Sequence, residues 1–205
     1  MARVIAENFN QLYYDSGVWQ NNYWMGVQIL KNPCDMMVIQ EIIYETMPDT
    51  IVETGSFAGG SALFYSHCLI LSGKSNGMIY SIDINDKYGE YPRPIRKNIE
   101  WVTGNSVDVD VCDYISKSIR GRTMVILDSC NRKYHVLVEM EAYGPLVTPG
   151  NYLIVEETNQ GGFLTYPDPR AALDEFLLSH SEFVIDKNRG KHLLTFNPNG
   201  YLKRL

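Results

Sequence analysis

Acidic side chains stand at the ends of several short apolar segments of this sequence, and the first of them precedes a glycine-rich turn. The segment Ile51-Val52 ends in Glu53, and Thr54-Gly55-Ser56-Phe57-Ala58-Gly59-Gly60-Ser61 follows. This is neither the G-x-G-x-x-G of dinucleotide-binding proteins nor a phosphate-binding P-loop. A carboxylate at this place repels phosphate and attracts a cation. The pattern therefore favours a ligand with an ammonium or sulfonium group.

A second acid, Asp83, ends the segment Tyr80-Ser81-Ile82, 30 positions after Glu53. A carboxylate there can accept hydrogen bonds from both hydroxyls of a ribose. The spacing alone also suits a nicotinamide enzyme, and capping without a ligand is an alternative. The acid, the G-x-x-x-G turn and the ribose acid together resemble class I S-adenosylmethionine-dependent methyltransferases, which we favour over a dinucleotide enzyme. After the next apolar segment, Asn105 and Ser106 could border an adenine ring, although Ser106 could equally be a helix N-cap.

Three further carboxylates follow two later apolar segments. Asp128 comes directly after one, and Glu156 and Glu157 come after the next. Neighbouring parallel strands lie about 5 Å apart, so these side chains could converge at one edge of a sheet. Three carboxylates repel one another unless a cation or protons intervene, and oxygen ligands suit Mg²⁺ or a similar hard divalent ion. Separate, solvated carboxylates are the equally weighted alternative.

Short apolar segments that alternate with helical patterns must position these acids, which predicts an α/β fold with a largely parallel sheet. Apolar residues at helical spacing after Asn32-Pro33 predict a helix of about 14 residues that ends near Pro48. The predicted strands are Thr50–Glu53, Met78–Asp83, Glu100–Thr103, Thr123–Asp128, Asn151–Glu156, Glu182–Asp186 and Lys191–Phe196. Further helices are predicted at Gly60–Leu71, Val109–Ile119, Tyr134–Tyr143 and Arg170–Leu178.

Length and composition limit the remaining possibilities. The 205 residues, 45% hydrophobic and 20% charged, indicate one globular domain. A net charge of −6 opposes nucleic-acid binding, which depends on neutralising phosphates. The sequence shows no membrane-spanning apolar run and no secretory signal, so we expect a cytoplasmic protein that does not bind membranes. The four cysteines are scattered, which suggests neither a zinc cluster nor a disulfide framework.

From about Tyr23 to its end, the sequence resembles the cephalosporin hydroxylase family of S-adenosylmethionine-dependent methyltransferases. The resemblance rests on Tyr23-Trp24-Met25-Gly26-Val27, Gln40-Glu41-Ile42, Val52-Glu53-Thr54-Gly55 with Gly59-Gly60-Ser61, Ile126-Leu127-Asp128-Ser129, and Leu193-Leu194-Thr195-Phe196-Asn197-Pro198 with Gly200-Tyr201-Leu202. The core is also similar to Mg²⁺-dependent catechol O-methyltransferases. These resemblances imply a Rossmann-like class I methyltransferase fold with a seven-stranded, mostly parallel sheet whose last hairpin is antiparallel. We expect one domain, with a helical and aromatic N-terminal extension over 1–48 and the Rossmann-like core over 49–205.

The resemblance also implies roles for single residues. Glu53, Gly55 and Ser61 would hold the amino-acid end of the cofactor, with Asp128 beside them. Asp83 would hold its ribose, and Asn105 and Ser106 its adenine. The metal ligands would be Asp128, Glu156 and Glu157.

One position departs from the pattern of these families. The catechol enzymes have a general-base lysine three positions after the first metal acid, and the nearer family often has histidine there, whereas this sequence has Asn131. An amide cannot accept the proton at neutral pH. The replacement candidates are His135 and Lys133, and His135 could equally be a structural histidine.

These observations predict a metal-assisted O-methyltransferase that acts on a hydroxylated small molecule or a sugar, as a homo-oligomer by resemblance. Candidates for a lid or an acceptor wall are Tyr13, Tyr14, Trp19, Tyr23, Trp24, Phe163 and Tyr166, although packing is favoured for the N-terminal ones. The segment Asn159 to Asp168 departs from the family pattern and leaves the acceptor open. Two alternatives are a non-catalytic cofactor-binding subunit and, less favoured, an iron-dependent oxygenase that uses His180, Glu182 and His192.

Overall fold

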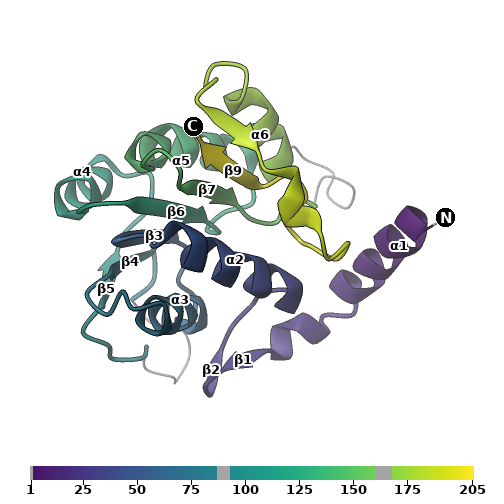
Figure 1. The fold of residues 1–205 in the computed structure, drawn as a ribbon, viewed down its shortest axis with the longest axis horizontal. Helices are drawn as coiled ribbons and strands as arrows, with labels where there is room; N and C mark the ends of the chain where they lie inside the picture. The colour runs from purple at the N-terminus through teal and green to yellow at the C-terminus, as the bar shows by residue number, and fades with distance from the viewer. Residues whose placement is uncertain (1, 87–92, 160–167) are drawn as a thin grey trace.

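The computed structural model describes residues 2–86, 93–159 and 168–205. Its centre is a seven-stranded sheet in the order β5-β4-β3-β6-β7-β9-β8, in which only β9 runs antiparallel to its neighbours (Figure 1). The strands are β3 (Thr50–Thr54), β4 (Met78–Asp83), β5 (Ile99–Thr103), β6 (Thr123–Leu127), β7 (Tyr152–Val155), β8 (Phe183–Ile185) and β9 (Tyr201–Arg204). The predicted seven-stranded, mostly parallel sheet is therefore confirmed.

Helices cover both faces of the sheet (Figure 1). On one face lie α2 (Pro33–Thr46) and α3 (Gly60–Leu71), which pack against apolar side chains of the strands such as Ile51 and Ile126. On the other face lie α4 (Val109–Ser118), α5 (Lys133–Tyr143) and α6 (Pro169–Phe176), which pack against Val52 and Leu127. Since both faces are covered, the side chains of the central strands β3 and β6 are buried on both sides of the sheet, and most of them are apolar.

The order of the strands reverses between β3 and β6, because the chain builds β4 and β5 on one side of β3 and then returns to its other side. Ligands of open α/β sheets bind beyond the carboxyl ends of the strands at such a reversal. Glu53, at the end of β3, and Asp128, just after β6, lie at this point.

The N-terminal region lies beside this core (Figure 1). It consists of α1 (Ala2–Asp15), a 3₁₀ turn η1 (Val18–Asn21) and a small hairpin of β1 (Tyr23–Trp24) and β2 (Val27–Gln28). Asn32 caps α2, because its side chain accepts a hydrogen bond from the backbone N–H of Cys34 at 2.9 Å, and Pro33 occupies the first helical position. The predicted start of this helix is confirmed.

The last predicted strand, Lys191–Phe196, is wrong. This segment follows a 3₁₀ turn, η4 (Lys187–Gly190), and Leu193 has a positive φ of 63°, which interrupts an extended chain. The Asp35 carboxylate accepts hydrogen bonds from Thr195 Oγ1 at 2.5 Å and from the backbone N–H of Phe196 at 2.8 Å, so these groups are bound to α2 instead of a strand. The last strand of the sheet is β9 instead. Elsewhere in the chain, a short 3₁₀ turn, η2 (Gly144–Leu146), follows α5.

No helix in the part of the chain that the structure describes is long and apolar enough to cross a membrane.

Candidate active site

The glycine turn between β3 and α3 forms the middle of the candidate site. Gly55 has a φ of +88°, and a Cβ there would lie 2.0 Å from the backbone oxygen of Asp128. A Cβ on Gly60, at the start of α3, would lie 2.2 Å from the backbone oxygen of Gln28. Glycine is therefore required at both positions, because the turn packs directly against the end of β6 on one side and against β2 on the other.

Two adjoining cavities lie along this turn, and both are lined by Gly55, Asp83 and Ser129. The first has a volume of about 230 Å³ and the second about 340 Å³. The first is also lined by Trp19, Gln28, Ile29, Leu30, Lys31, Ser56, Phe57, Gly60, Ser61, Asp128, Asn131 and Glu157. The second is also lined by Ile82, Ile84, Gly104, Asn105, Ser106, Cys130 and His135. They lie next to each other along the carboxyl ends of β3, β4, β5 and β6 and together are called the cleft below.

Asp83 joins the two cavities. Its Oδ2 accepts hydrogen bonds from the backbone N–H groups of Ser56 at 2.9 Å and Phe57 at 3.0 Å, and its Oδ1 accepts one from Asn85 at 3.0 Å. These bonds fix the glycine turn against β4. Because Asp83 lines both cavities, its carboxylate lies where a ligand of either cavity can reach it.

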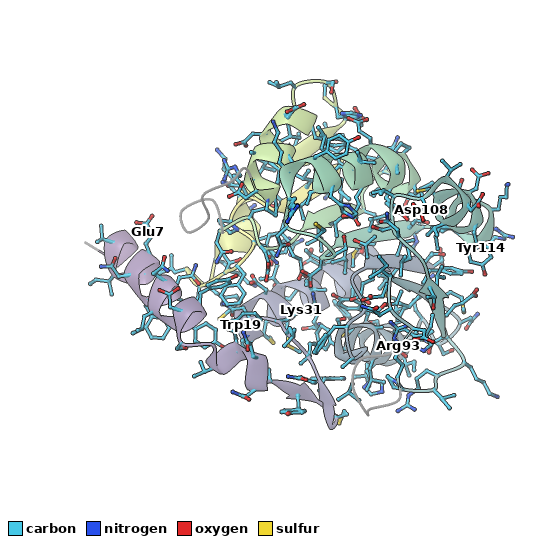
Figure 2. All side chains as sticks on the ribbon, turned by 180° about the vertical axis from the view of Figure 1, so that it is seen from behind. Glu7, Trp19, Lys31, Arg93, Asp108 and Tyr114 are labelled. Atoms are coloured by element: carbon cyan, nitrogen blue, oxygen red, sulfur yellow. The ribbon has the colours of Figure 1, made fainter. Side chains whose placement is uncertain are left out.

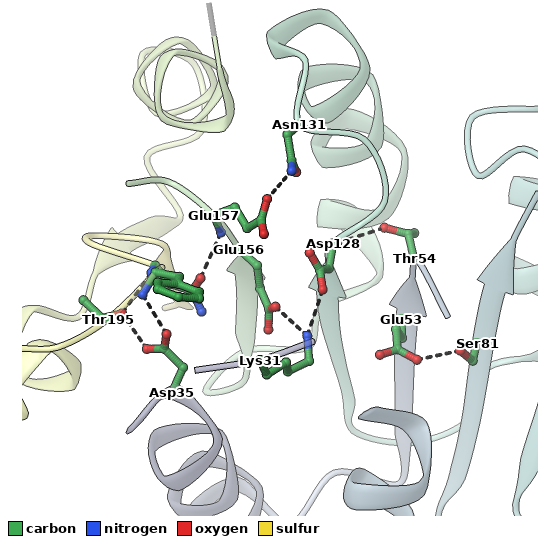
Figure 3. Close-up of polar contacts among 12 residues, drawn as sticks. Lys31, Asp35, Glu53, Thr54, Ser81, Asp128, Asn131, Glu156, Glu157 and Thr195 are labelled. Atoms are coloured by element: carbon green, nitrogen blue, oxygen red, sulfur yellow. Dashed lines mark hydrogen bonds and ion pairs between the residues drawn. The ribbon is translucent and has the colours of Figure 1, made fainter. Parts of the chain in front are cut away.

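Glu53 lies beneath the turn and does not line either cavity. Its side chain is fully buried and accepts a hydrogen bond from Ser81 Oγ at 2.5 Å (Figure 3). Burial raises its pKa to about 7, although the charge of Lys31 and a hydrogen bond from Ser61 act in the opposite direction. The expected contact of Glu53 with the cofactor remains a prediction. In the structure the Glu53 side chain lies beneath the glycine turn and is directed towards Ser81 on the neighbouring strand.

The carboxylates after β6 and β7 converge, but on a lysine (Figure 3). Lys31 Nζ donates hydrogen bonds to Asp128 Oδ2 at 2.9 Å and to Glu156 Oε2 at 2.5 Å. Burial alone would lower the pKa of Lys31, but the charges of Asp128 and Glu156 outweigh it and hold this pKa well above its ordinary value. The two carboxylates therefore favour the charged form of this lysine. The sequence analysis did not identify Lys31 as a site residue. The available signal was its position, as a single charged residue between the apolar pair Ile29-Leu30 and a helix cap.

Glu157 is held differently from Glu156. Its φ is +55°, its backbone N–H donates to Asn197 Oδ1 at 2.9 Å, and its carboxylate accepts a hydrogen bond from the Asn131 amide (Figure 3). Among the described residues, no three His, Cys, Asp or Glu side chains are arranged so that they could hold a metal ion as they stand. Glu156 nevertheless has a buried oxygen, Oε1, without a hydrogen-bond partner, and the Lys31 ammonium lies between Asp128 and Glu156. Carboxylate oxygens suit a hard divalent ion, so Asp128 and Glu156 are the side chains whose chemistry fits one.

The three candidate bases occupy different places. Asn131 lines the first cavity. His135 lines the second, where its Nε2 lies 3.1 Å from Ser106 Oγ and 3.5 Å from Glu139 Oε1. Lys133 forms an ion pair with Glu175 of α6 at 2.5 Å, outside both cavities. The structure therefore offers no support for Lys133 as the base, and it places His135 with the side chains predicted to border adenine.

Asn105 and Ser106, which the sequence predicts to border adenine, both line the second cavity. Ser106 is not a helix N-cap, because α4 begins after Asp108. Its hydroxyl lies against His135, and its backbone oxygen accepts a hydrogen bond from the Tyr143 hydroxyl at 2.6 Å. The loop after β5 is thus tied to α5, which gives the second cavity a fixed wall.

Aromatic side chains of the N-terminal region mainly pack, as favoured. The ring of Phe196 contacts Tyr13, Tyr14 and Trp19, at centroid distances of 5.9, 5.2 and 5.6 Å. Trp19 also lines the first cavity, so it serves both packing and the site. Trp24 packs against Phe64 at 4.9 Å, and Tyr23 is exposed. The other wall candidates, Phe163 and Tyr166, lie outside the described residues, as does most of the segment between Asn159 and Asp168.

The structure contradicts the iron-site alternative. His180 stacks on Phe176 with ring centroids 3.8 Å apart, and its Nε2 lies 3.4 Å from Glu141. His180, Glu182 and His192 are all described residues, and they form no metal-binding group. The lone histidines in this part of the chain are therefore structural or exposed.

Comparison with known proteins gives a consistent result. A family described as Rhamnosyl O-methyltransferase/CmcI matches residues 16–205. The rhamnosyl O-methyltransferase of Mycobacterium leprae is 32% identical over 209 residues, which cover 98% of this chain and 90% of that protein. The Mycobacterium bovis (strain BCG / Pasteur 1173P2) enzyme of the same name is 30% identical over 214 residues, covering 98% of this chain and 85% of that protein.

Solved structures agree on the fold. A structure of CmcI with Mg and SAM has a TM-score of 0.70 at 21% identity, and covers 91% of this chain and 77% of that chain. The O-methyltransferase TomG from Streptomyces achromogenes, in complex with SAM, has a TM-score of 0.59 at 17% identity, and covers 74% of this chain and 70% of that chain.

Proposed function

This chain belongs to the rhamnosyl O-methyltransferase/CmcI family, and we propose that it transfers the methyl group of S-adenosylmethionine to a hydroxyl group of a sugar or a sugar-bearing small molecule. The observation that carries this proposal is the pair of adjoining cavities that extends from Ser106 past Asp83 and Gly55 to Asp128. Its larger half suits a nucleoside. Its smaller half, next to the carboxylates, suits the cationic amino-acid end and the acceptor.

The described residues divide the binding of the methyl donor between the two cavities. Asp83 would accept hydrogen bonds from the ribose, with Asn105, Ser106 and the imidazole of His135 around the adenine. At the other end, Gly55, Ser61 and Asp128 would hold the amino-acid part, and the negative charge of Asp128 would attract both the ammonium and the sulfonium. Each of these side chains or backbone groups is already fixed by the strand ends and the glycine turn.

Methyl transfer to oxygen is an in-line displacement at carbon, so the protein's main contribution is to align sulfonium, methyl group and acceptor oxygen. Trp19 and Phe57 line the cavity that would hold the acceptor, and these apolar side chains limit water there. A divalent ion held by Asp128, Glu156 and Glu157 would lower the pKa of the acceptor hydroxyl. Asn131 can orient the acceptor or Glu157 through its amide but cannot remove the proton, so we propose that the proton leaves to solvent.

Two coarser features complete the proposal. We propose a homo-oligomer, because apolar side chains of α1, namely Val4, Ile5, Phe9 and Leu12, are between 49% and 66% exposed.

We also propose a cytoplasmic location, which agrees with four free cysteines, one of them buried.

The test is isothermal titration of the purified protein with S-adenosylmethionine, with and without Mg²⁺, beside Asp83→Ala and Asp128→Asn. We expect Asp83→Ala to lose cofactor binding and Asp128→Asn to lose the Mg²⁺ heat. Lys133→Ala is a matched control, since Lys133 lies outside both cavities. A panel of neutral glycosides with free hydroxyls, including rhamnosides, then serves to detect methyl transfer by mass spectrometry. No cofactor binding would refute the proposal, and binding without transfer over the panel would favour a non-catalytic subunit.

A further inference from the structure

Lys31 is a buried charge in the middle of the candidate site that the proposed chemistry does not use. It follows β2 and precedes the cap of α2, and its side chain is 3% exposed. Figure 2 shows it in the interior of the molecule, whereas Glu7 lies on the outlying helix α1. A charged side chain in such a place is costly unless it is paired, so its position is determined by its partners.

Its partners are two of the proposed metal ligands, and it uses one oxygen of each. Nζ bonds to Asp128 Oδ2 and Glu156 Oε2, as described above (Figure 3). Three buried oxygen atoms near this pair have no hydrogen-bond partner within the described protein, namely Glu53 Oε1, Tyr65 Oη and Glu156 Oε1. The lysine therefore leaves the second oxygen of Glu156 available to another cation.

The formal charges of this cluster can be counted. Asp128 and Glu156 together carry −2 when both are ionised, and the ammonium of Lys31 brings the total for these three groups to −1. Without the lysine the pair would carry −2, so it would attract every cation more strongly, and trivalent ions most, because Coulomb energy is proportional to the charge of the ion.

We propose that Lys31 is a positioning residue that acts as an internal counter-cation. Its ammonium holds the carboxylates of Asp128 and Glu156 together and neutralises part of their negative charge. It thereby sets the affinity of the metal site and its preference between divalent and trivalent ions. This inference rests on the proposed function, because it requires that these carboxylates bind a divalent ion. It assigns the weakening of metal binding to the charge of Lys31, not to the presence of a side chain there.

The experiment measures metal binding, not methyl transfer. Binding of Mn²⁺ is followed by electron paramagnetic resonance of the free ion, and binding of Tb³⁺ by its luminescence, for the wild type, Lys31→Gln and Lys31→Arg. Glutamine keeps N–H donors for both carboxylates but removes the charge, whereas arginine keeps the charge. Lys74→Gln is the matched control, because Lys74 forms an ion pair with Asp49 at the opposite edge of the sheet. Thermal unfolding reports whether each variant is folded, and Lys31→Met replaces Lys31→Gln if the latter is not.

We expect Lys31→Gln to bind Mn²⁺ roughly tenfold more tightly than the wild type, and to gain still more affinity for Tb³⁺. Lys31→Arg and Lys74→Gln should remain near the wild type. A larger gain in affinity for Tb³⁺ than for Mn²⁺ would show that the charge of Lys31 is responsible, because a merely structural role would not distinguish the two ions by their charge. If Lys31→Gln binds Mn²⁺ equally or less tightly, the inference is wrong while the proposed function stands. If neither the wild type nor any variant binds Mn²⁺, the metal site itself is wrong, and the inference falls with it.

Discussion

Replacing Glu53 with glutamine should make the protein more stable at neutral and alkaline pH, but not at acidic pH. The side chain is fully buried, and its pKa is raised from the ordinary 4.5 to about 7, chiefly by burial. Between these two values the native chain keeps a proton on Glu53 that the unfolded chain has lost. The native state therefore binds more protons, and its stability falls as the pH rises through this window. At about 1.4 kcal/mol per pH unit, the loss reaches roughly 3 kcal/mol above pH 7.

The measurement is urea unfolding of the wild type and Glu53→Gln at a series of pH values from about 4 to 8, without metal or cofactor. Glutamine can still accept the hydrogen bond from Ser81 and carries no charge at any of these pH values. We expect the difference in free energy of unfolding to shift in favour of the variant by roughly 3 kcal/mol over the series. Titrating groups that do not interact with Glu53 cancel in this difference. A difference that does not change with pH would refute the buried, proton-retaining Glu53 on which the reasoning depends.

Three further substitutions test other parts of the structure. Asp35→Ala should lower the free energy of unfolding by about 3 kcal/mol in urea titrations, because the backbone N–H of Phe196 and other buried donors lose their acceptor. Gly60→Ala should weaken cofactor binding about tenfold or more by titration calorimetry, because its Cβ would displace the backbone of Gln28 from the cavity wall. Lys133→Ala should change kcat/KM less than twofold, and a hundredfold loss would restore this lysine as the base.

Most of the fold could be predicted because its central strands are buried on both faces. Such strands are rich in apolar residues and are followed by polar turns, so β3 and β4 are visible in the sequence within a residue of their observed bounds. The last strand could not be located in this way. Leu193 and Leu194 are as apolar as the residues of a strand, but the Asp35 carboxylate, about 160 positions away, binds Thr195 and the chain after it. The pattern of apolar residues along this segment gives no information about a contact with such a distant residue.

The candidate site was predictable where a residue's role follows from its place at a strand end. Asp83 and Asp128 are of this kind, because the backbone alone brings them to the cleft. Glu53 occupies an equivalent place, yet its side chain turns to Ser81 and away from the cleft, and the sequence does not specify that direction. The pairing of Lys31 could not be predicted, since its two partners are 97 and 125 positions away.

The sheet and the N-terminal region supply opposite parts of the site. The strand ends provide acids, namely Asp83, Asp128, Glu156 and Glu157, and acids alone would repel one another. The compensating charge comes from Lys31, and one apolar wall comes from Trp19. Both lie in the segment before α2, which packs on the glycine turn so closely that Gly60 has no room for a side chain. The region that carries no recognised cofactor motif is therefore an integral part of the site, which agrees with a family match that begins at residue 16, before the first strand of the sheet.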